Sequence, residues 1–144
     1  MKPVYQTIFT HPGGDCVRAS LASIFNLDLD NVPDFANMPM DDWWTPLQEW
    51  CIQFDVYPIY IPYHKSISRR IKGYHLIFGL TKNKIPHAVV GHNGVEFHNP
   101  ASKEAESDMS KIEEIEGIVL FISMMEKPNV NTSKCNSNGS FNAG

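Results

Sequence analysis

Hydrophobic side chains recur at helical spacing in the first third of the chain and at strand spacing in the rest. Val17, Leu21 and Ile24 lie three to four positions apart, which predicts a helix over residues 16–25. A second helix is predicted over residues 41–54, with an apolar face formed by Trp43, Leu47, Trp50 and Phe54. The two helices therefore come first, and each has one face that fits a core.

Beyond residue 55, short segments rich in β-branched and aromatic residues are bounded by Gly, Asn and Pro. This composition is typical of strands, and we predict them at residues 56–60, 74–80, 86–91, 94–98 and 118–124. The Asn93-Gly94 pair between two of these strands favours a tight hairpin. We expect residues 4–9 to be extended, and the polar residues 101–116 to form a loop with a short helix near 110–115.

Helices followed by an antiparallel meander of strands indicate an α+β fold in two layers, with the N-terminal helices packed on the sheet. We assign residues 1–126 to one domain, because about 125 residues suffice for a single core. Residues 127–144 are rich in Asn, Ser and Gly and lack apolar periodicity. They are expected to form a disordered tail.

The charge of the chain narrows its expected partners. The formal net charge is −4 and basic residues cluster only at Arg69, Arg70 and Lys72, so no nucleic-acid partner is expected. No apolar run has the length of a membrane span, and the first residues lack the apolar segment of a signal peptide. We expect a cytoplasmic protein with no membrane partner and no cofactor. The sequence leaves its oligomeric state open.

The three cysteines are widely spaced and include no CxxC pair, which argues against a disulfide framework and a zinc ribbon. Cys51 lies in a predicted helix and is interpreted as a packing residue, and Cys135 lies in the tail and is interpreted as incidental. Three histidines near the predicted hairpin lack zinc-ligand spacing, so no metal site is expected from them: His87, His92 and His98.

Cys16 is the cysteine whose surroundings favour chemistry. It begins the first predicted helix, after Gly13-Gly14 and Asp15, whose carboxylate is a good N-cap for the first-turn amides. Unpaired N–H groups and the positive end of the helix dipole stabilise a thiolate at such a position. The glycines allow close approach of a substrate and let the Cys16 amide face an oxyanion. The alternative is a small buried residue that only packs.

A cysteine hydrolase also needs a histidine and a group that orients it. His87 begins one predicted strand, and Asn99 follows the strand after the Asn93-Gly94 turn. Antiparallel pairing makes the two residues cross-strand neighbours, so the Asn99 oxygen can accept a hydrogen bond from the imidazole. His98 alternates with Asn99 and is expected to face away. His75 is interpreted as a strand histidine with a hydrogen-bonded ring, with a position in the same cleft as the alternative.

A Gln in the N-terminal segment, a Gly-rich turn, a Cys at a helix start, and later His-Ala-Val-Val and Asn-Pro together resemble the papain-like cysteine peptidase superfamily. The likeness is greatest to its compact bacterial and phage branch, which includes bacteriocin-processing-type peptidase domains, and it covers residues 4–100. The resemblance implies a papain-like fold, Cys16 as nucleophile, His87 as general base and acid, and Asn99 as the orienting residue. It also implies Gln6 as an oxyanion donor beside the Cys16 amide.

Two functions remain open. The first is a thiol protease or other amide-bond hydrolase, acting through a Cys16 thioester on a peptide, a protein or a small amide. Amidases, deamidases and transglutaminase-type acyl transferases use the same residues. The second is an inactive binding protein of phage or bacterial origin that captures a host factor, in the host cytoplasm if it is phage-encoded. The Cys16 and His87 pair favours the first. Asn99, at a position often occupied by Asp, and the ten positions from Gln6 to Cys16 favour the second.

Substrate specificity has no recognisable code in this sequence. It is expected to come from residues 27–42, 62–73 and 101–116. The adjacent Trp43 and Trp44 cannot both face a core, so one lies nearer solvent, either as a packing residue or as the wall of a cleft.

Overall fold

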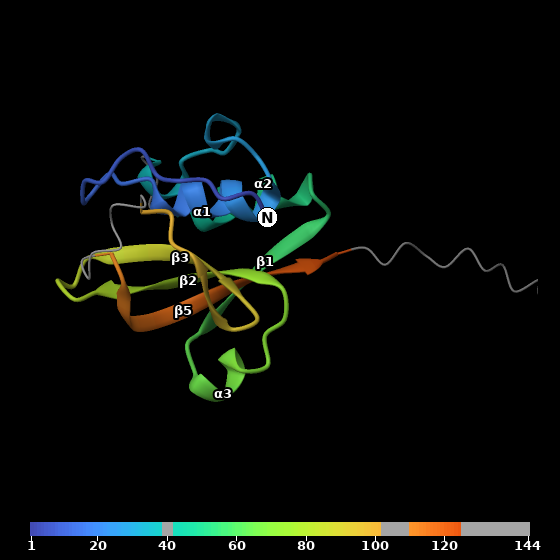
Figure 1. Cartoon of the computed structure of the whole chain (residues 1–144). Helices are drawn as coiled ribbons and strands as arrows, with labels where there is room; N and C mark the ends of the chain where they lie inside the picture. Colours follow the sequence, from blue (N-terminus) through green and yellow to red (C-terminus); the bar gives the residue numbers. More distant parts are fainter. Residues whose placement is uncertain (39–41, 102–109, 125–144) are drawn as a thin grey trace, which may run out of the picture.

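The structure is a computed structural model that describes residues 1–38, 42–101 and 110–124. Helices α1 and α2 cover one face of a five-stranded sheet, and the short helix α3 lies on the opposite side (Figure 1). The elements in chain order are α1 (Cys16–Phe25), the 3₁₀ helices η1 (Leu29–Asn31) and η2 (Phe35–Asn37), α2 (Trp44–Ile52), β1 (Val56–Pro62), α3 (Lys65–Ser68), β2 (Tyr74–Thr81), β3 (Pro86–His92), β4 (Val95–His98) and β5 (Ile112–Ser123). The predicted α+β class is therefore confirmed.

The sheet is antiparallel with strand order β1-β5-β2-β3-β4. The predicted meander holds for β2, β3 and β4, but it is wrong for β5, which lies between β1 and β2. The expected helix near 110–115 is also wrong, because β5 begins at Ile112. Its first half carries exposed glutamates, which gave this strand the composition of a loop. Residues 102–109 and the predicted tail 127–144 lie outside the described residues.

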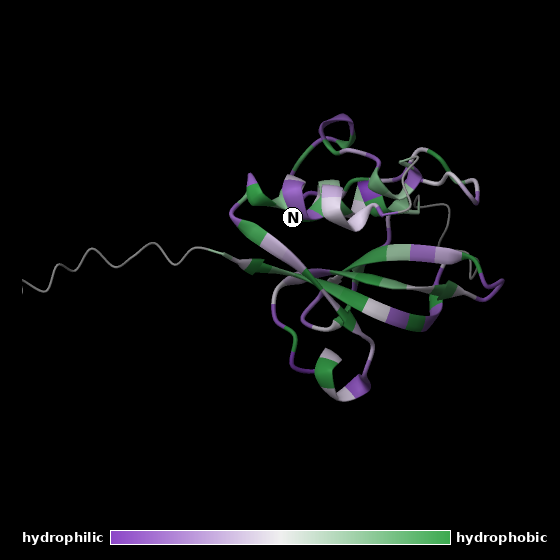
Figure 2. Ribbon diagram, turned by 180° about the vertical axis from the view of Figure 1, so that it is seen from behind, coloured by the Kyte–Doolittle hydropathy of each residue, from purple (hydrophilic) through white to green (hydrophobic). Residues whose placement is uncertain are grey.

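The main core lies between the helices and the sheet. Helix α1 packs mainly against β3, and α2 packs against β1. The fully buried side chains there include Leu21, Leu47, Cys51, Leu76 and Val119. Burial of each leucine stabilises the fold by about 1.5–3 kcal/mol. In Figure 2 the strands beneath the helices are largely hydrophobic. No helix in the described ranges is long and apolar enough to cross a membrane.

The opposite face of the sheet buries a second, smaller set of side chains. Ile77, Val89 and Ile118 alternate with residues of the main core along their strands and are almost fully buried. His75 is buried among the same strands, opposite Gly91. A Cβ atom at position 91 would collide with the His75 ring, so the glycine makes room for this imidazole.

The N-terminal segment before α1 forms no strand, and the predicted extended stretch 4–9 does not join the sheet. It is held by hydrogen bonds at both ends. The Val4 amide donates to Ser23 Oγ at 2.9 Å, and the Gln6 amide donates to the Pro100 carbonyl at 2.8 Å. These contacts place Gln6 between α1 and the chain that follows β4.

Candidate active site

A cavity of about 300 Å³ lies at the start of α1, and three of the four predicted site residues line it. Cys16 comes from α1, His87 comes from the beginning of β3, and Gln6 comes from the N-terminal segment. Asn99, which follows β4, contacts His87 directly. The fold therefore brings together four residues that are spread over more than ninety positions of the sequence.

The contact between His87 and Asn99 has a defined polarity. His87 Nε2 lies 2.8 Å from Asn99 Oδ1. The Asn99 amide nitrogen donates to the Ser110 carbonyl at 2.9 Å, and its oxygen also accepts from the Ala101 amide at 3.1 Å. These two bonds fix Oδ1 as the acceptor, so His87 Nε2 carries the proton. The Nδ1 nitrogen of the neutral ring is then the unprotonated one and can act as a base.

The route by which Asn99 reaches His87 differs from the predicted cross-strand pair. Strand β4 pairs with β3 only as far as Val90 and His98, with a register shift between Val90 and Gly91. Asn99 lies just beyond the paired region, and its side chain reaches His87 three positions before Val90. The predicted contact is present, but Asn99 makes it from just after the last paired residue of β4, where a β-bulge has shifted the register.

The Cys16 thiol is more buried than its place at a helix start suggests. Burial raises the pKa of Cys16 above its ordinary value of 9.0. Hydrogen bonds from the backbone amides of Ala88, Val17 and Cys16 itself oppose this rise, and the negative charge of Asp15 adds to it. The amides at the helix start act in the predicted direction, but the loss of solvent around the thiol outweighs them and favours the protonated form.

His87 shows the complementary effect. Burial lowers its pKa below the ordinary value of 6.5, while the hydrogen bond to Asn99 and the charge of Glu96 oppose the shift. The hydrogen bonds of the described residues include none between Cys16 and His87. Both groups are thus neutral near pH 7, and the pair is a thiol beside an imidazole base rather than an ion pair.

Gln6 lines the cavity with its amide partly engaged. Its nitrogen donates to the Ile8 carbonyl at 2.9 Å, which leaves the second amide proton for another acceptor. The buried oxygen of the Gln6 side chain has no hydrogen-bond donor among the described residues.

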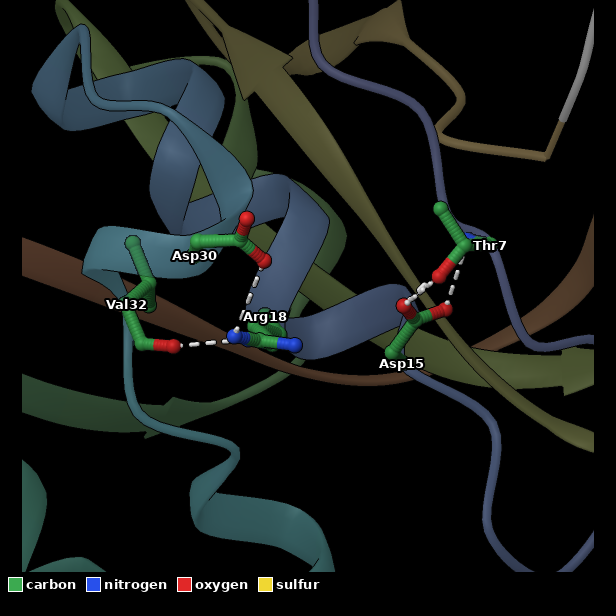
Figure 3. Close-up of polar contacts among 5 residues, drawn as sticks. All are labelled: Thr7, Asp15, Arg18, Asp30 and Val32. Carbon is green, nitrogen blue, oxygen red and sulfur yellow. Dashed lines mark hydrogen bonds and ion pairs between the residues drawn. The ribbon is translucent and has the colours of Figure 1, made fainter.

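Asp15 holds this segment in place, a role that the sequence did not indicate. Its carboxylate is fully buried and accepts from the Thr7 amide at 3.0 Å and the Thr7 hydroxyl at 2.9 Å (Figure 3). It also accepts from the Ile8 amide at 2.9 Å. It makes no side-chain hydrogen bond to the first turn of α1, so the predicted N-cap bond is wrong. The carboxylate instead connects the residue before Cys16 to the residues after Gln6.

The N-cap residue of α2 is Trp43, and the carboxylate of the preceding Asp42 bonds the first turn. Asp42 accepts hydrogen bonds from the Trp44 amide at 2.8 Å and the Thr45 hydroxyl at 2.7 Å. Asp41 lies outside the described residues. The helix itself runs from Trp44 to Ile52, slightly shorter than the predicted 41–54.

Arg18 fixes the connection after α1. Its Nε donates to the Val32 carbonyl at 2.6 Å, and its guanidinium lies 3.9 Å from the Asp30 carboxylate (Figure 3). The ion pair contributes little because Asp30 is almost fully exposed, but the carbonyl bond ties η1 to the helix. Arg18 and Asp15 together anchor the chain on both sides of Cys16.

Both glycines and aromatic side chains line the cavity. A Cβ atom on Gly14 would lie 2.7 Å from the Thr10 carbonyl oxygen, so the turn before Cys16 requires glycine there. Trp43 and Phe78 also line the cavity. Trp43 thus forms a wall of the cavity, but the expectation that only one of the two tryptophans faces the core is wrong, because Trp43 and Trp44 are both half-buried against it.

The other candidate residues lie elsewhere. Cys51 is fully buried in the core, and burial raises its pKa to about 12, as a packing role predicts. The His98 ring makes no hydrogen bond to the described residues of the cavity. Its Nε2 donates to the Val4 carbonyl at 2.8 Å. His75 does not line the cavity, and its Nε2 has no partner among the described residues, contrary to a fully hydrogen-bonded ring. Cys135 is outside the described residues, and within them no metal-ligand cluster occurs.

The chain matches no protein-family model, no curated protein and no solved structure.

Proposed function

We propose that this protein is a papain-like cysteine hydrolase that cleaves an amide or peptide bond through a thioester on Cys16. The supporting observation is the hydrogen bond from His87 Nε2 to Asn99, which leaves Nδ1 as a base in the cavity that also contains Cys16. A half-buried cysteine and a half-buried, oriented histidine in one cavity are the parts that nucleophilic acyl transfer requires.

The chemistry follows from the neutral pair. His87 Nδ1 takes the proton of the Cys16 thiol as sulfur attacks the carbonyl carbon, which forms a tetrahedral oxyanion. The free amide proton of Gln6 and the backbone N–H of Cys16 stabilise that oxyanion. The protonated His87 then gives its proton to the leaving amine, and a water molecule hydrolyses the thioester. Asn99 holds the ring during both transfers.

The second candidate is an inactive binding protein that keeps this cavity. It is favoured by the raised pKa of Cys16, by the lack of a bond between Cys16 and His87 in the described residues, and by the Gln6 amide already bound to Ile8. The two candidates predict different behaviour of the thiol.

Iodoacetamide labelling across pH tests the proposal. Cys135→Ser serves as background, so that the signal comes from Cys16. We expect the labelling rate to rise as His87 loses its proton, below pH 6.5, and to stay level through neutral pH. In His87→Ala the rate is expected to rise only as the thiol ionises, above pH 9.0. At pH 7 the loss is about 100-fold, and Asn99→Ala loses about tenfold.

The control is His64→Ala, which removes an exposed histidine beside α3. It should leave the profile unchanged. Identical profiles for the parent and His87→Ala would reject the hydrolase and favour the binding protein.

A further inference from the structure

The cavity beside Cys16 carries a negative charge without a partner. Among the described residues that line it, Glu116 on β5 has the only carboxylate, and none is Lys or Arg. In the described part of the chain, the Glu116 side chain makes no hydrogen bond or ion pair. The nearby Glu114, in contrast, is paired with Lys84 at 2.8 Å. Glu116 is exposed, so its unpaired carboxylate is accessible to a ligand in the cavity.

The sheet register places Glu116 two strands away from His87. His87 on β3 pairs with Gly79 on β2, and Gly79 pairs with Ile115 on β5, the residue before Glu116. Strands two apart in a sheet are separated by about 10 Å. The side chain of a bound lysine or arginine has a stem of three or four carbons. Together with the Glu116 side chain, it is long enough to span this distance.

Several side chains that line the cavity are apolar. Trp43 and Phe78 line the cavity, and so does Ile85 in the turn between β2 and β3. Such walls suit the methylene stem of Lys or Arg, which packs on apolar surface while its head stays charged. An apolar side chain would cover the carboxylate without pairing it, and an acidic one would be repelled by it.

We propose that the cavity selects a basic group, with an apolar stem and a terminal cation as in lysine or arginine, next to the bond that Cys16 attacks. This inference rests on the proposed function for the position of the bond. The preference itself comes from Glu116 and the apolar walls. The substrate class is thus a peptide or small amide with a basic side chain at that place.

Two chloroacetamide probes test the inference, one with an aminopentyl chain and one with a hydroxypentyl chain. Their rates of reaction with Cys16 are measured by intact mass in the Cys135→Ser background. We expect the cationic probe to react about two- to fivefold faster. The ratio falls toward one in Glu116→Gln and at high salt. Glu113→Gln, on the same strand but outside the cavity lining, keeps the ratio.

A second measurement does not need a reactive thiol. Nα-acetyl-lysine amide is expected to shift the indole N–H resonance of Trp43 at lower concentration than Nα-acetyl-norleucine amide. Equal rates for the two probes, equal ratios in the parent and Glu116→Gln, or equal shifts by the two amides would overturn the inference. If Cys16 reactivity depends on His87 but the probes react equally, only this inference fails. If the cationic probe reacts faster but the reactivity of Cys16 does not depend on His87, only the proposed hydrolase function fails.

Discussion

Cys16 and Cys51 are both helix cysteines with raised pKa values, yet they lie in opposite kinds of surroundings. Cys51, near the end of α2, is fully buried in the core, and burial alone raises its pKa to about 12. Cys16, at the start of α1, lines a cavity and receives hydrogen bonds from three backbone amides that oppose the rise. The difference shows that a helix start does not by itself activate a thiol. Amide donors, a cavity and a nearby base distinguish the reactive candidate.

The largest expected effect is a difference in labelling between the two thiols of the native protein. Cys51 reacts only when the core opens, so we expect it to react with iodoacetamide at least about 10³-fold more slowly than Cys16. Peptide mapping of the Cys135→Ser protein after brief labelling measures both rates. Comparable labelling of both cysteines would remove the distinction between the two regions.

The next effect concerns what holds the start of α1. Asp15→Ala leaves the buried donors of Thr7 and Ile8 without an acceptor, so we expect a loss of about 3 kcal/mol in the free energy of unfolding. Asp42→Ala is the matched control, because its exposed carboxylate only caps α2, and it should cost about 1 kcal/mol. Urea unfolding measures both. Equal losses would mean that Asp15 acts as an ordinary cap.

A smaller effect is the contribution of the Cys51 thiol to the pH dependence of the free energy of unfolding. The folded pKa of Cys51 lies above its unfolded value, so the unfolded chain releases this proton first and stability falls as pH rises beyond about 8.5. Between pH 8 and pH 10 the Cys51 thiol is expected to cost about 2 kcal/mol. Urea unfolding of the parent and of Cys51→Ala at both pH values isolates this contribution. The same loss in both proteins would show that Cys51 ionises freely in the fold.

The sequence predicted the elements that repeat a local pattern and missed those set by distant contacts. The bounds of α1 and the hairpin at Asn93-Gly94 follow from periodicity and turn chemistry, and both are confirmed. The central place of β5 could not be predicted, because its first half is charged and its partners lie far away in the sequence. Strand pairing predicted that Asn99 and His87 meet, although Asn99 lies just after the paired residues of β4.

The protonation of the site residues was harder to predict than which residues form the site. The sequence identified Cys16, His87, Asn99 and Gln6 as neighbours, but it gave Cys16 a stabilised thiolate. Burial is a property of the whole fold and reversed that expectation. The role of Asp15 was missed for a related reason. An Asp before a helix predicts a cap on the first turn, but the Asp15 carboxylate instead accepts from the amides of Thr7 and Ile8, which lie earlier in the chain.

The position of β5 has a consequence for the order in which the protein is made. This strand follows the other four along the chain but pairs with both β1 and β2. During synthesis, the residues of the His87 and Asn99 pair leave the ribosome before the strand that joins β2 to β1. Until residues 112–123 emerge, β1 and β2 have unpaired edges and the sheet remains in two parts. Completion of the fold therefore waits for a strand that provides none of the four predicted catalytic side chains.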